Sequence, residues 1–269
     1  MVDNLWRGAR WYHTIELPGG EVTPGEFDLR DSVQRVGLPK SLAGQRCLDV
    51  GTRDGFWAFE LERRGAAEVV GIDVDETERL DWPSGLPPIS PEAEQEMLER
   101  GRCFELARSA LGSNVERRNL SVYDLDPADV GTFDFAFLGT LLIHLRDPVA
   151  ALAAVARVLR PGGILLLNET VSTSLSLLRP RSPAAALMTL DAPFWWQPNR
   201  HALARYITAA GLECQFIGRP YFVRRGPAMV VPPLQWRNPQ LGAFSRQLLL
   251  RAGLPHVSLV ATRPLNAAG

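Results

Sequence analysis

The segment CLDVGTRDGF, from Cys47 to Phe56, constrains the fold more than any other part of the chain. An apolar run typical of a buried strand ends at Val50 and continues directly into a turn between Gly51 and Gly55. Glycines at both ends of the turn let the backbone approach a ligand closely, and a helix that begins behind them directs its N-terminus at that ligand. The segment predicts a ligand-binding strand, turn and helix.

The rest of the chain repeats this alternation of strands and helices. Short apolar runs at 69–73, 133–138 and 163–167 are typical of buried parallel strands. Between the last two, residues 149–159 carry apolar side chains at helical spacing and are followed by the helix stop Arg-Pro-Gly-Gly. Such alternation indicates an α/β fold with a doubly wound sheet.

Several segments lie outside the minimal alternation. We expect residues 1–40 to form an N-terminal cap and residues 41–269 to form the main domain. The Pro-rich stretch 80–92 and the segment 227–253, with a helix at 241–252, are expected to be lids. Long decorations on such a fold commonly cover the ligand end of the sheet.

Charge and cysteine usage restrict the partners and the compartment. The 269 residues include 29 Lys and Arg against 30 Asp and Glu, which argues against a nucleic-acid partner and favours a small molecule. Three widely separated cysteines form neither a disulfide framework nor a metal cluster, and no metal is expected. Without a signal-peptide pattern or an apolar run of membrane-spanning length, we expect a cytoplasmic protein with no membrane partner.

A second acidic residue helps to identify the ligand. Asp73 ends the next strand about 20 residues after the turn, where a ribose diol would bind. A dinucleotide fingerprint needs a second glycine where Arg53 stands, whereas Asp49 suits a ligand with an ammonium group and no phosphate. The alternative, left open here, is that Asp49 caps the turn and Asp73 is a solvated strand end.

These motifs resemble those of the class I S-adenosylmethionine-dependent methyltransferases. LDVG-x-x-x-G, GIDVD, FDFAFLGTLLIHLRDP and LRPGGILLLNE follow the order of that class over about residues 45–170. The resemblance implies a doubly wound, seven-stranded Rossmann-like sheet and S-adenosylmethionine as cofactor. It implies that the methionine part lies at Asp49, Gly51, Arg53 and Gly55, the ribose at Asp73 and Val74, the adenine at Ser121 and Val122, and the sulfonium at Gly139 and Thr140.

A narrower resemblance covers most of the chain. WYHTIELPGGEVTPGEFDLRD, LLIHLRDP and WWQPNRHALARYITAAGL are similar to the branch of the tRNA wobble-uridine carboxymethyltransferases and their shorter relatives. Members that use a carboxylated cofactor carry a tyrosine and a basic residue where this chain has Ile143 and the neighbourhood of His256. Because an unpaired carboxylate in a dry pocket costs several kcal/mol, we expect the ordinary cofactor.

Methyl transfer depends mostly on positioning, and a base assists a hydroxyl acceptor by roughly 10²- to 10⁴-fold. The catalytic candidates are His13, His144 and Glu169, although His144 could simply pack below a strand end and Glu169 could be a solvated strand end. The acceptor candidates are Tyr12, Asp191, Trp195 and Trp196, since paired aromatic residues could form a wall for a ring.

The resulting hypothesis is an enzyme that methylates a hydroxyl of a sugar or natural product, the substrate class implied by the shorter relatives. A tRNA wobble-uridine methyl- or carboxymethyltransferase and a non-catalytic module that binds S-adenosylmethionine are the alternatives. The expected partner is a small-molecule acceptor with a hydroxyl, and a homodimer is left open.

Overall fold

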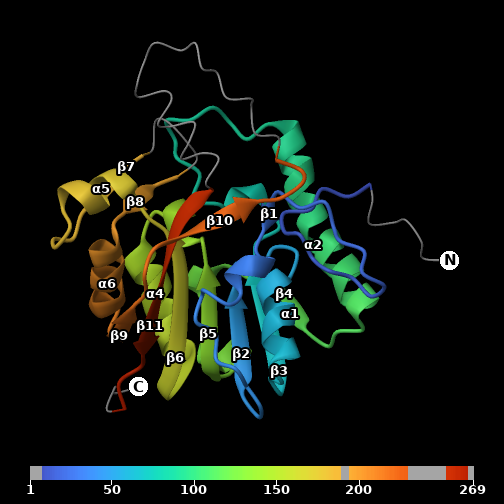
Figure 1. The fold of residues 1–269 in the computed structure, drawn as a ribbon, viewed down its shortest axis with the longest axis horizontal. Coiled ribbons are helices and arrows are strands. Elements are labelled where there is room, and N and C mark those ends of the chain that lie inside the picture. The colour runs from blue at the N-terminus through green and yellow to red at the C-terminus, as the bar shows by residue number, and fades with distance from the viewer. Residues whose placement is uncertain (1–7, 189–193, 230–252, 266–269) are drawn as a thin grey trace.

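The computed structural model describes residues 8–188, 194–229 and 253–265. In this part of the chain a nine-stranded sheet follows the order β1-β10-β11-β6-β5-β2-β3-β4, with β9 also paired to β11 (Figure 1). A separate two-stranded sheet consists of β7 and β8. The strands are β1 (Phe27–Asp28), β2 (Arg46–Val50), β3 (Glu68–Asp73), β4 (Glu116–Asn119), β5 (Phe133–Gly139), β6 (Leu159–Thr170), β7 (Ala185–Leu187), β8 (Trp196–Pro198), β9 (Glu213–Ile217), β10 (Tyr221–Arg225) and β11 (Leu254–Thr262).

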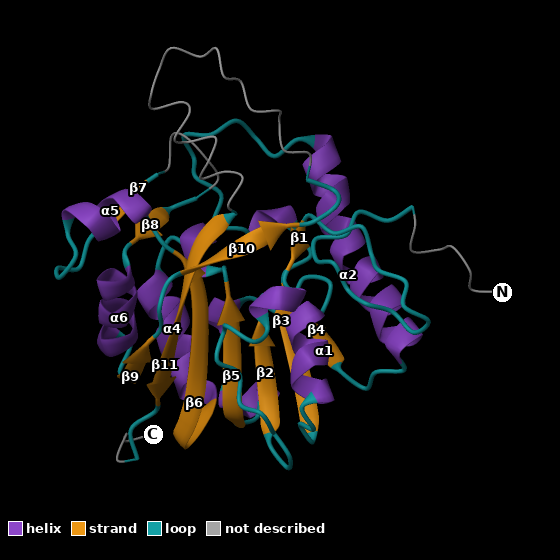
Figure 2. Ribbon diagram, in the orientation of Figure 1, coloured by secondary structure: helices purple, strands orange, loops and turns teal. Residues whose placement is uncertain are grey.

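The helices alternate with the strands of the main sheet (Figure 2). The α-helices are α1 (Phe56–Arg63), α2 (Pro91–Leu111), α3 (Pro127–Val130), α4 (Pro148–Val158), α5 (Thr173–Leu178) and α6 (Arg200–Ala209). Short 3-10 helices are η1 (Arg30–Ser32), η2 (Thr77–Arg79), η3 (Val122–Asp124) and η4 (Leu142–His144).

The predicted doubly wound fold is confirmed. Strands β2, β3 and β4 progress toward one edge of the sheet, the chain then returns to β5 and β6 on the other side of β2, and all these pairings are parallel. The strand β11 is antiparallel to β6. Two features extend the predicted seven-stranded sheet: β1 joins β10, and the segment before β11 forms two strands, β9 and β10, interrupted by Gly218, Arg219 and Pro220.

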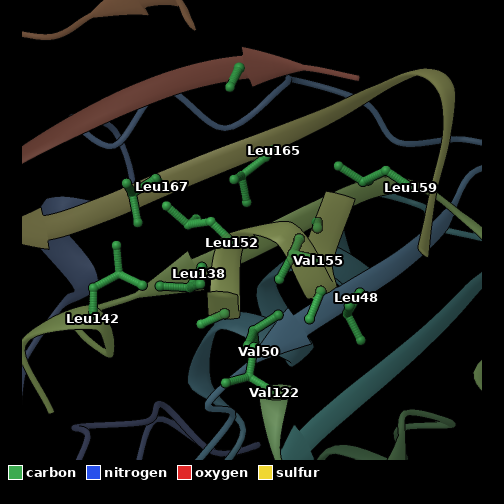
Figure 3. Packing of buried hydrophobic residues seen from close by; sticks show 14 of the residues in the cluster. Leu48, Val50, Val122, Leu138, Leu142, Leu152, Val155, Leu159, Leu165 and Leu167 are labelled. Carbon is green, nitrogen blue, oxygen red and sulfur yellow. The ribbon is translucent and has the colours of Figure 1, made fainter. Parts of the chain in front are cut away.

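Two hydrophobic cores lie on the two faces of the sheet. On the face of α4 and α6, leucines and valines of the strands pack against apolar residues of α4 such as Leu152 and Val155 (Figure 3). On the opposite face, α1 and α2 pack with the N-terminal segment, which contributes Trp11 and Ile15. Successive residues of a strand therefore serve different cores, and this alternation decides which side chains reach the site.

Capping residues explain where the helices begin. Asp147 accepts a hydrogen bond from the Ala150 amide at 2.8 Å, and Pro148 occupies the first position of α4. Ser90 and Pro91 play the same roles in α2, which ends at Gly112 in the left-handed conformation. Helix α4 agrees with the predicted helix at 149–159, and the Arg-Pro-Gly-Gly that stops it forms the first part of β6.

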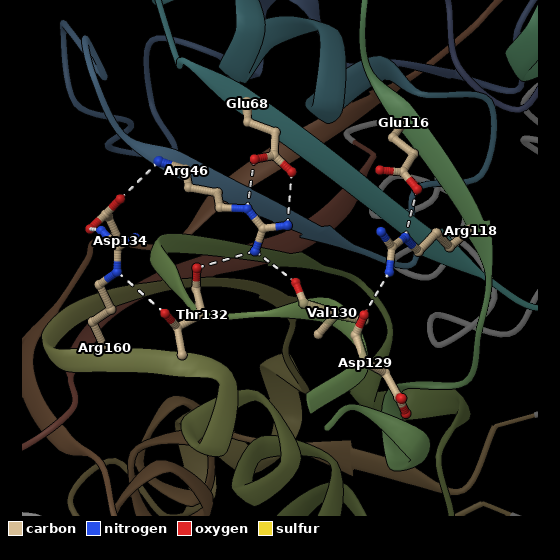
Figure 4. A network of polar contacts seen from close by, with 9 residues as sticks. All are labelled: Arg46, Glu68, Glu116, Arg118, Asp129, Val130, Thr132, Asp134 and Arg160. Carbon is tan, nitrogen blue, oxygen red and sulfur yellow. Dashed lines mark hydrogen bonds and ion pairs between the residues drawn. The ribbon is translucent and has the colours of Figure 1, made fainter. Parts of the chain in front are cut away.

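A polar network links the amino ends of the strands, at the end of the sheet away from the site (Figure 4). Arg46 of β2 makes two hydrogen bonds of 2.8 Å to the carboxylate of Glu68 in β3, and it donates to the Val130 carbonyl at 2.7 Å. Arg160 of β6 pairs with Asp134 of β5. These contacts fix the strand order at one end, while the opposite ends remain available for ligands.

The N-terminal segment is integrated into the main sheet. Strand β1 pairs with β10 through Phe27 and Arg225, and the amide of Thr14 donates to the Phe27 carbonyl at 2.9 Å. A domain boundary at residue 40 stays a prediction. Most of the predicted lid at 227–253, including its helix, lies outside the described residues. No helix in the described ranges has both the length and the apolar character needed to cross a membrane.

Candidate active site

A cavity of about 330 Å³ opens at the carboxyl ends of the parallel strands. It lies where the chain order reverses between β2 and β5, so Gly51 after β2 and Gly139 and Thr140 at the end of β5 line it together. Open α/β sheets bind ligands at this switch point. The N-terminal segment and β10 contribute further walls through His13 and Val223.

The turn after β2 brings backbone close to the cavity. Gly51 has φ +79° and Arg53 has φ +53°, and both line the cavity. A positive φ at arginine is uncommon, and it is held here because the Arg53 amide donates to Asp73 at 2.7 Å. The Arg53 guanidinium lies 4.2 Å from the centre of the Tyr12 ring, which also lines the cavity.

Gly55 has a packing role instead of the predicted cofactor contact. It does not line the cavity; it precedes α1 with φ +92°. A Cβ atom at this position would lie 2.4 Å from Phe59 and 2.8 Å from Phe104. The glycine is therefore required for the close approach of α1 and α2 below the turn.

Asp73, at the end of β3, is one of the two acidic residues that line the cavity. Its carboxylate accepts hydrogen bonds from the amides of Arg53 and Val74, at 2.7 and 2.8 Å. Each carboxylate oxygen has a second lone pair, so both can still accept from a neighbouring diol. Asp73 and Val74 both line the cavity, as the ribose assignment requires.

Asp49 occupies a different position from the one predicted. Its side chain is 1% exposed and is absent from the cavity wall, and its Oδ2 has no hydrogen-bond partner. Burial raises the pKa of Asp49 to about 7, although the Thr52 side chain opposes the shift. The residue lies beneath the turn because odd-numbered residues of β2 face the α1 side of the sheet, so direct contact with the cofactor is not supported.

The predicted adenine residues Ser121 and Val122 line the cavity beside a wall formed by the Pro-rich stretch 80–92, which the sequence predicts to be a lid. Asp81 and Trp82, from the Pro-rich stretch after β3, close this side together with Tyr123. The Tyr123 hydroxyl donates to Asp81 Oδ2 at 2.6 Å, and the Arg146 amide donates to the same atom at 2.7 Å. We call Asp81, Tyr123 and Arg146 the latch, since they join three loops over the adenine side.

His13 forms a buried dyad with Asp54, the residue before Gly55. Nδ1 of His13 bonds to Oδ1 of Asp54, while Oδ2 accepts from the amides of Tyr12 at 2.9 Å and His13 at 2.8 Å. Burial alone would raise the pKa of Asp54, but the charge and hydrogen bonds of His13 hold that pKa below its usual range. An ionised Asp54 only accepts hydrogen bonds, so Nδ1 of His13 carries a proton that it donates to Asp54, and Nε2 is the ring nitrogen that is not bound to Asp54.

The other two catalytic candidates differ in their position. His144 lines the cavity, with its ring 5.1 Å from that of Phe194. Glu169 does not line the cavity, because it alternates with Asn168 along β6 and faces the α4 side. Its carboxylate is fully buried and accepts from the Leu142 and Thr170 amides, both at 2.8 Å. It holds the loop that carries His144, and the prediction of a catalytic Glu169 is not supported.

The predicted acceptor-binding residues also differ in whether they line the cavity. Tyr12 lines the cavity, but Trp195 and Trp196 do not. The indole of Trp195 donates to the Asp81 carbonyl, and that of Trp196 donates to the Arg146 carbonyl at 3.0 Å, so both support the latch from outside. Asp191 lies outside the described residues. Among the described residues, no group of three His, Cys, Asp or Glu side chains could hold a metal ion.

Ile143 and His256 stand where the members of the carboxymethyltransferase branch that use a carboxylated cofactor carry a tyrosine and a basic residue. Ile143 is buried and its carbonyl accepts from the Trp195 amide at 2.7 Å. His256 lines the cavity, and burial lowers the pKa of its ring to about 4. Burial therefore favours the neutral form of the His256 ring.

The cavity fits S-adenosylmethionine on its own geometry. Asp73 presents acceptor atoms for a ribose diol, Val122 and Leu120 provide apolar surface for an adenine, and the Gly51 turn allows close approach of a methionine chain. Residues 26–216 match the family model of a methyltransferase domain. The chain belongs to this family of methyltransferases, and S-adenosylmethionine is its cofactor.

Curated relatives and solved structures agree with this assignment. The ubiquinone biosynthesis O-methyltransferase of Hahella chejuensis is 32% identical over 161 residues, which are 59% of this chain and 56% of that protein. The chain thus spans little more than half the length of the curated relatives it matches.

The solved structures share the fold. An S-adenosylmethionine-dependent methyltransferase from Mesorhizobium loti has a TM-score of 0.50 at 15% identity, covering 87% of this chain and 97% of its own. One from Methanosarcina mazei has a TM-score of 0.51 at 19% identity, covering 87% and 98%. The narrower resemblance to the tRNA wobble-uridine branch stays a prediction.

Proposed function

We propose that the protein transfers the methyl group of S-adenosylmethionine to a hydroxyl oxygen of a small organic acceptor. The observation that carries the proposal is the His13–Asp54 dyad, whose histidine lines the cofactor cavity. A hydroxyl is a poor nucleophile until it loses its proton, and a histidine fixed by a carboxylate is suited to accept that proton. The name of the Hahella relative, an O-methyltransferase, agrees with an oxygen acceptor.

When bound, the cofactor supplies a methyl group on a positively charged sulfur, which is already an activated leaving group. The protein then has to align the acceptor oxygen and take up its proton. Alignment contributes on the order of 7 to 11 kcal/mol, and a general base adds roughly 10²- to 10⁴-fold. We assign the orientation of the cofactor to Asp73 and Gly51 and the uptake of the proton to His13, all of which line the cavity.

The proton path follows from the hydrogen bonds of the dyad. Nε2 of His13 accepts the proton of the acceptor hydroxyl, and the resulting imidazolium remains paired with the buried carboxylate of Asp54. Asp54 is fixed in turn by the amides of Tyr12 and His13, so its position does not depend on mobile side chains. His144 also lines the cavity and is the second candidate for the base.

The acceptor class predicted from the sequence, a sugar or natural-product hydroxyl, lies within this proposal. It is supported by a cavity in which neutral side chains, His256, Asn168 and Thr140, lie beside the strand ends. The tRNA alternative stays a prediction without an observation of its own in its favour.

The test compares His13→Ala with a matched control, His201→Ala, whose ring in α6 bonds to the Pro180 carbonyl outside the cavity. Methyl transfer from radiolabelled S-adenosylmethionine is measured on a panel of phenols, catechols and glycosides, together with the affinity for S-adenosylhomocysteine. We expect His13→Ala to lower turnover by about 10²- to 10⁴-fold with affinity nearly unchanged, and the control to match wild type. Unchanged turnover in His13→Ala, or no binding of S-adenosylhomocysteine by wild type, would refute the proposal.

A further inference from the structure

Asn168, at the end of β6, has its side chain fixed by two hydroxyl groups. Its Oδ1 accepts from the Tyr221 hydroxyl at 2.7 Å and from the Ser258 hydroxyl at 3.3 Å. Both donors come from the neighbouring strands β10 and β11, and both lone pairs of Oδ1 are used. Burial raises the pKa of Tyr221 to about 12, so its hydroxyl keeps the proton that it donates.

The other end of the amide faces the cavity. Asn168 is only 2% exposed but lines the cavity, and it lies on the same face of the sheet as Leu166, which packs with the N-terminal segment. Since Oδ1 is directed at β10 and β11, Nδ2 is the atom left for the cavity. No hydrogen bond of Nδ2 occurs within the described ranges, and Nδ2 is not one of the fully buried atoms without a partner, so this donor is accessible to a ligand in the cavity.

Thr140 provides an acceptor atom beside this donor. The two residues are joined by their backbones, because the Thr140 amide donates to the Asn168 carbonyl at 2.8 Å. Nδ1 of His256 bonds to the Leu254 carbonyl at 2.8 Å, which places the ring proton there; Nε2 therefore accepts from the Thr140 hydroxyl at 3.0 Å. The Thr140 Oγ1 lone pairs remain, and this residue also lines the cavity.

The backbone of Thr140 is strained to hold this position. Its φ of +50° lies in the left-handed region, which a β-branched residue rarely adopts. Besides Thr140, Arg53 is the non-glycine residue with positive φ in the described part of the chain, and it lines the same cavity. Strain of this kind persists where the surroundings enforce it and commonly marks a binding site.

We propose that Asn168 Nδ2 and Thr140 Oγ1 together bind a second hydroxyl of the acceptor, one that is not methylated. A hydroxyl donates one hydrogen bond and accepts others, so a fixed donor next to a fixed acceptor is complementary to it. The acceptor is therefore a polyhydroxylated molecule, either a polyol or a polyphenol. This inference rests on the proposed function and specifies its substrate class.

Matched pairs of probes test the inference by binding in the presence of saturating S-adenosylhomocysteine. One pair is 4-methylcatechol and 4-methylphenol, and the other is cis-1,2-cyclohexanediol and cyclohexanol. NMR-detected titration should show one diol binding on the order of tenfold more tightly than its mono-hydroxy partner, because the second hydroxyl bonds to both the donor and the acceptor of the cavity wall. The pair that shows the difference distinguishes a polyphenol from a polyol.

Variants connect the preference to Asn168. In Asn168→Leu the two members of the pair should bind equally, with the affinity for S-adenosylhomocysteine unchanged. Tyr221→Phe, which removes only the oxygen that orients Asn168, should reduce the preference several-fold, while Tyr206→Phe on α6 should not, since Tyr206 does not line the cavity.

Equal binding within both pairs by wild type, absence of binding included, would overturn the inference, as would a preference that survives in Asn168→Leu. Either of these two results would refute the inference alone, and the proposed function would still be supported if S-adenosylhomocysteine binds and His13→Ala lowers turnover. Failure of wild type to bind S-adenosylhomocysteine would overturn both.

Discussion

Replacing Asp54 by Asn converts one of the two acceptor oxygens that face His13 into a donor NH2 group, and the hydrogen bonds around it determine the expected outcome. Asp54 Oδ2 accepts from two backbone amides at 2.8 and 2.9 Å, while Oδ1 accepts from the His13 ring. An asparagine has one acceptor oxygen. If its NH2 faced the two amides, both would lose their partner at roughly 1 to 3 kcal/mol each, so the oxygen will face the amides and the NH2 will face Nδ1.

That orientation reverses the tautomer of His13. Nδ1 must then accept, the proton moves to Nε2, and Nε2 can no longer take a proton from the acceptor. We expect turnover to fall by about 10²- to 10⁴-fold, equivalent to about 2.7 to 5.4 kcal/mol of transition-state stabilisation. The affinity for S-adenosylhomocysteine should change little, because Asp54 does not line the main cavity.

The assay is single-turnover methyl transfer with wild type, Asp54→Asn and Asp126→Asn. Asp126 caps α3 through the Ala128 amide at 2.8 Å, and asparagine is an equally good cap, which makes the control variant neutral. Turnover of Asp54→Asn within about threefold of wild type would refute the assignment of the base, because reversal of the His13 tautomer should lower turnover by about 10²-fold or more.

Three further predictions concern the cofactor and stability. Asp73→Ala should weaken the binding of S-adenosylhomocysteine by about 2 to 4 kcal/mol in calorimetry, since it removes charge-assisted hydrogen bonds to the ribose diol. Unchanged affinity would exclude the ribose assignment. Burial raises the pKa of Asp49 to about 7 in the folded protein, above its unfolded value. The free energy of unfolding of wild type, measured in urea, should therefore fall relative to that of Asp49→Asn by about 1 to 3 kcal/mol as pH rises from about 4 to about 7. A difference between the two proteins that is constant with pH would contradict this. Tyr123→Phe removes the hydrogen bond to Asp81 in the latch and should raise the dissociation rate of S-adenosylhomocysteine several-fold in stopped flow, while Tyr206→Phe should leave that rate unchanged. Equal dissociation rates for Tyr123→Phe and wild type would show that the latch does not retain the cofactor.

The sequence predicted what depends on local pattern. The apolar run and glycines of CLDVGTRDGF determine the strand, turn and helix, and the alternation of elements determines the doubly wound sheet. Positions on the turn and at strand ends were therefore predictable, and Gly51, Asp73, Ser121 and Thr140 all line the cavity.

What depends on long-range pairing could not be predicted. His13 and Asp54 lie 41 residues apart, and no local spacing signals their contact. The orientation of Glu169 could not be predicted for a related reason. Both faces of β6 are buried, so apolar residues occupy successive positions and hide the alternation that turns Asn168 to the cavity and Glu169 away from it. Asp49 and Gly55 belong to the motif but serve the packing below the turn.

Nitrogen NMR of the histidine rings reports on the cofactor site and on the base in a single titration with S-adenosylhomocysteine. We predict that His13 is protonated at Nδ1 with a free lone pair at Nε2, and that its signals shift on titration while those of His201 do not. A His13 ring protonated at Nε2, or one that is unaffected by saturating S-adenosylhomocysteine, would contradict it.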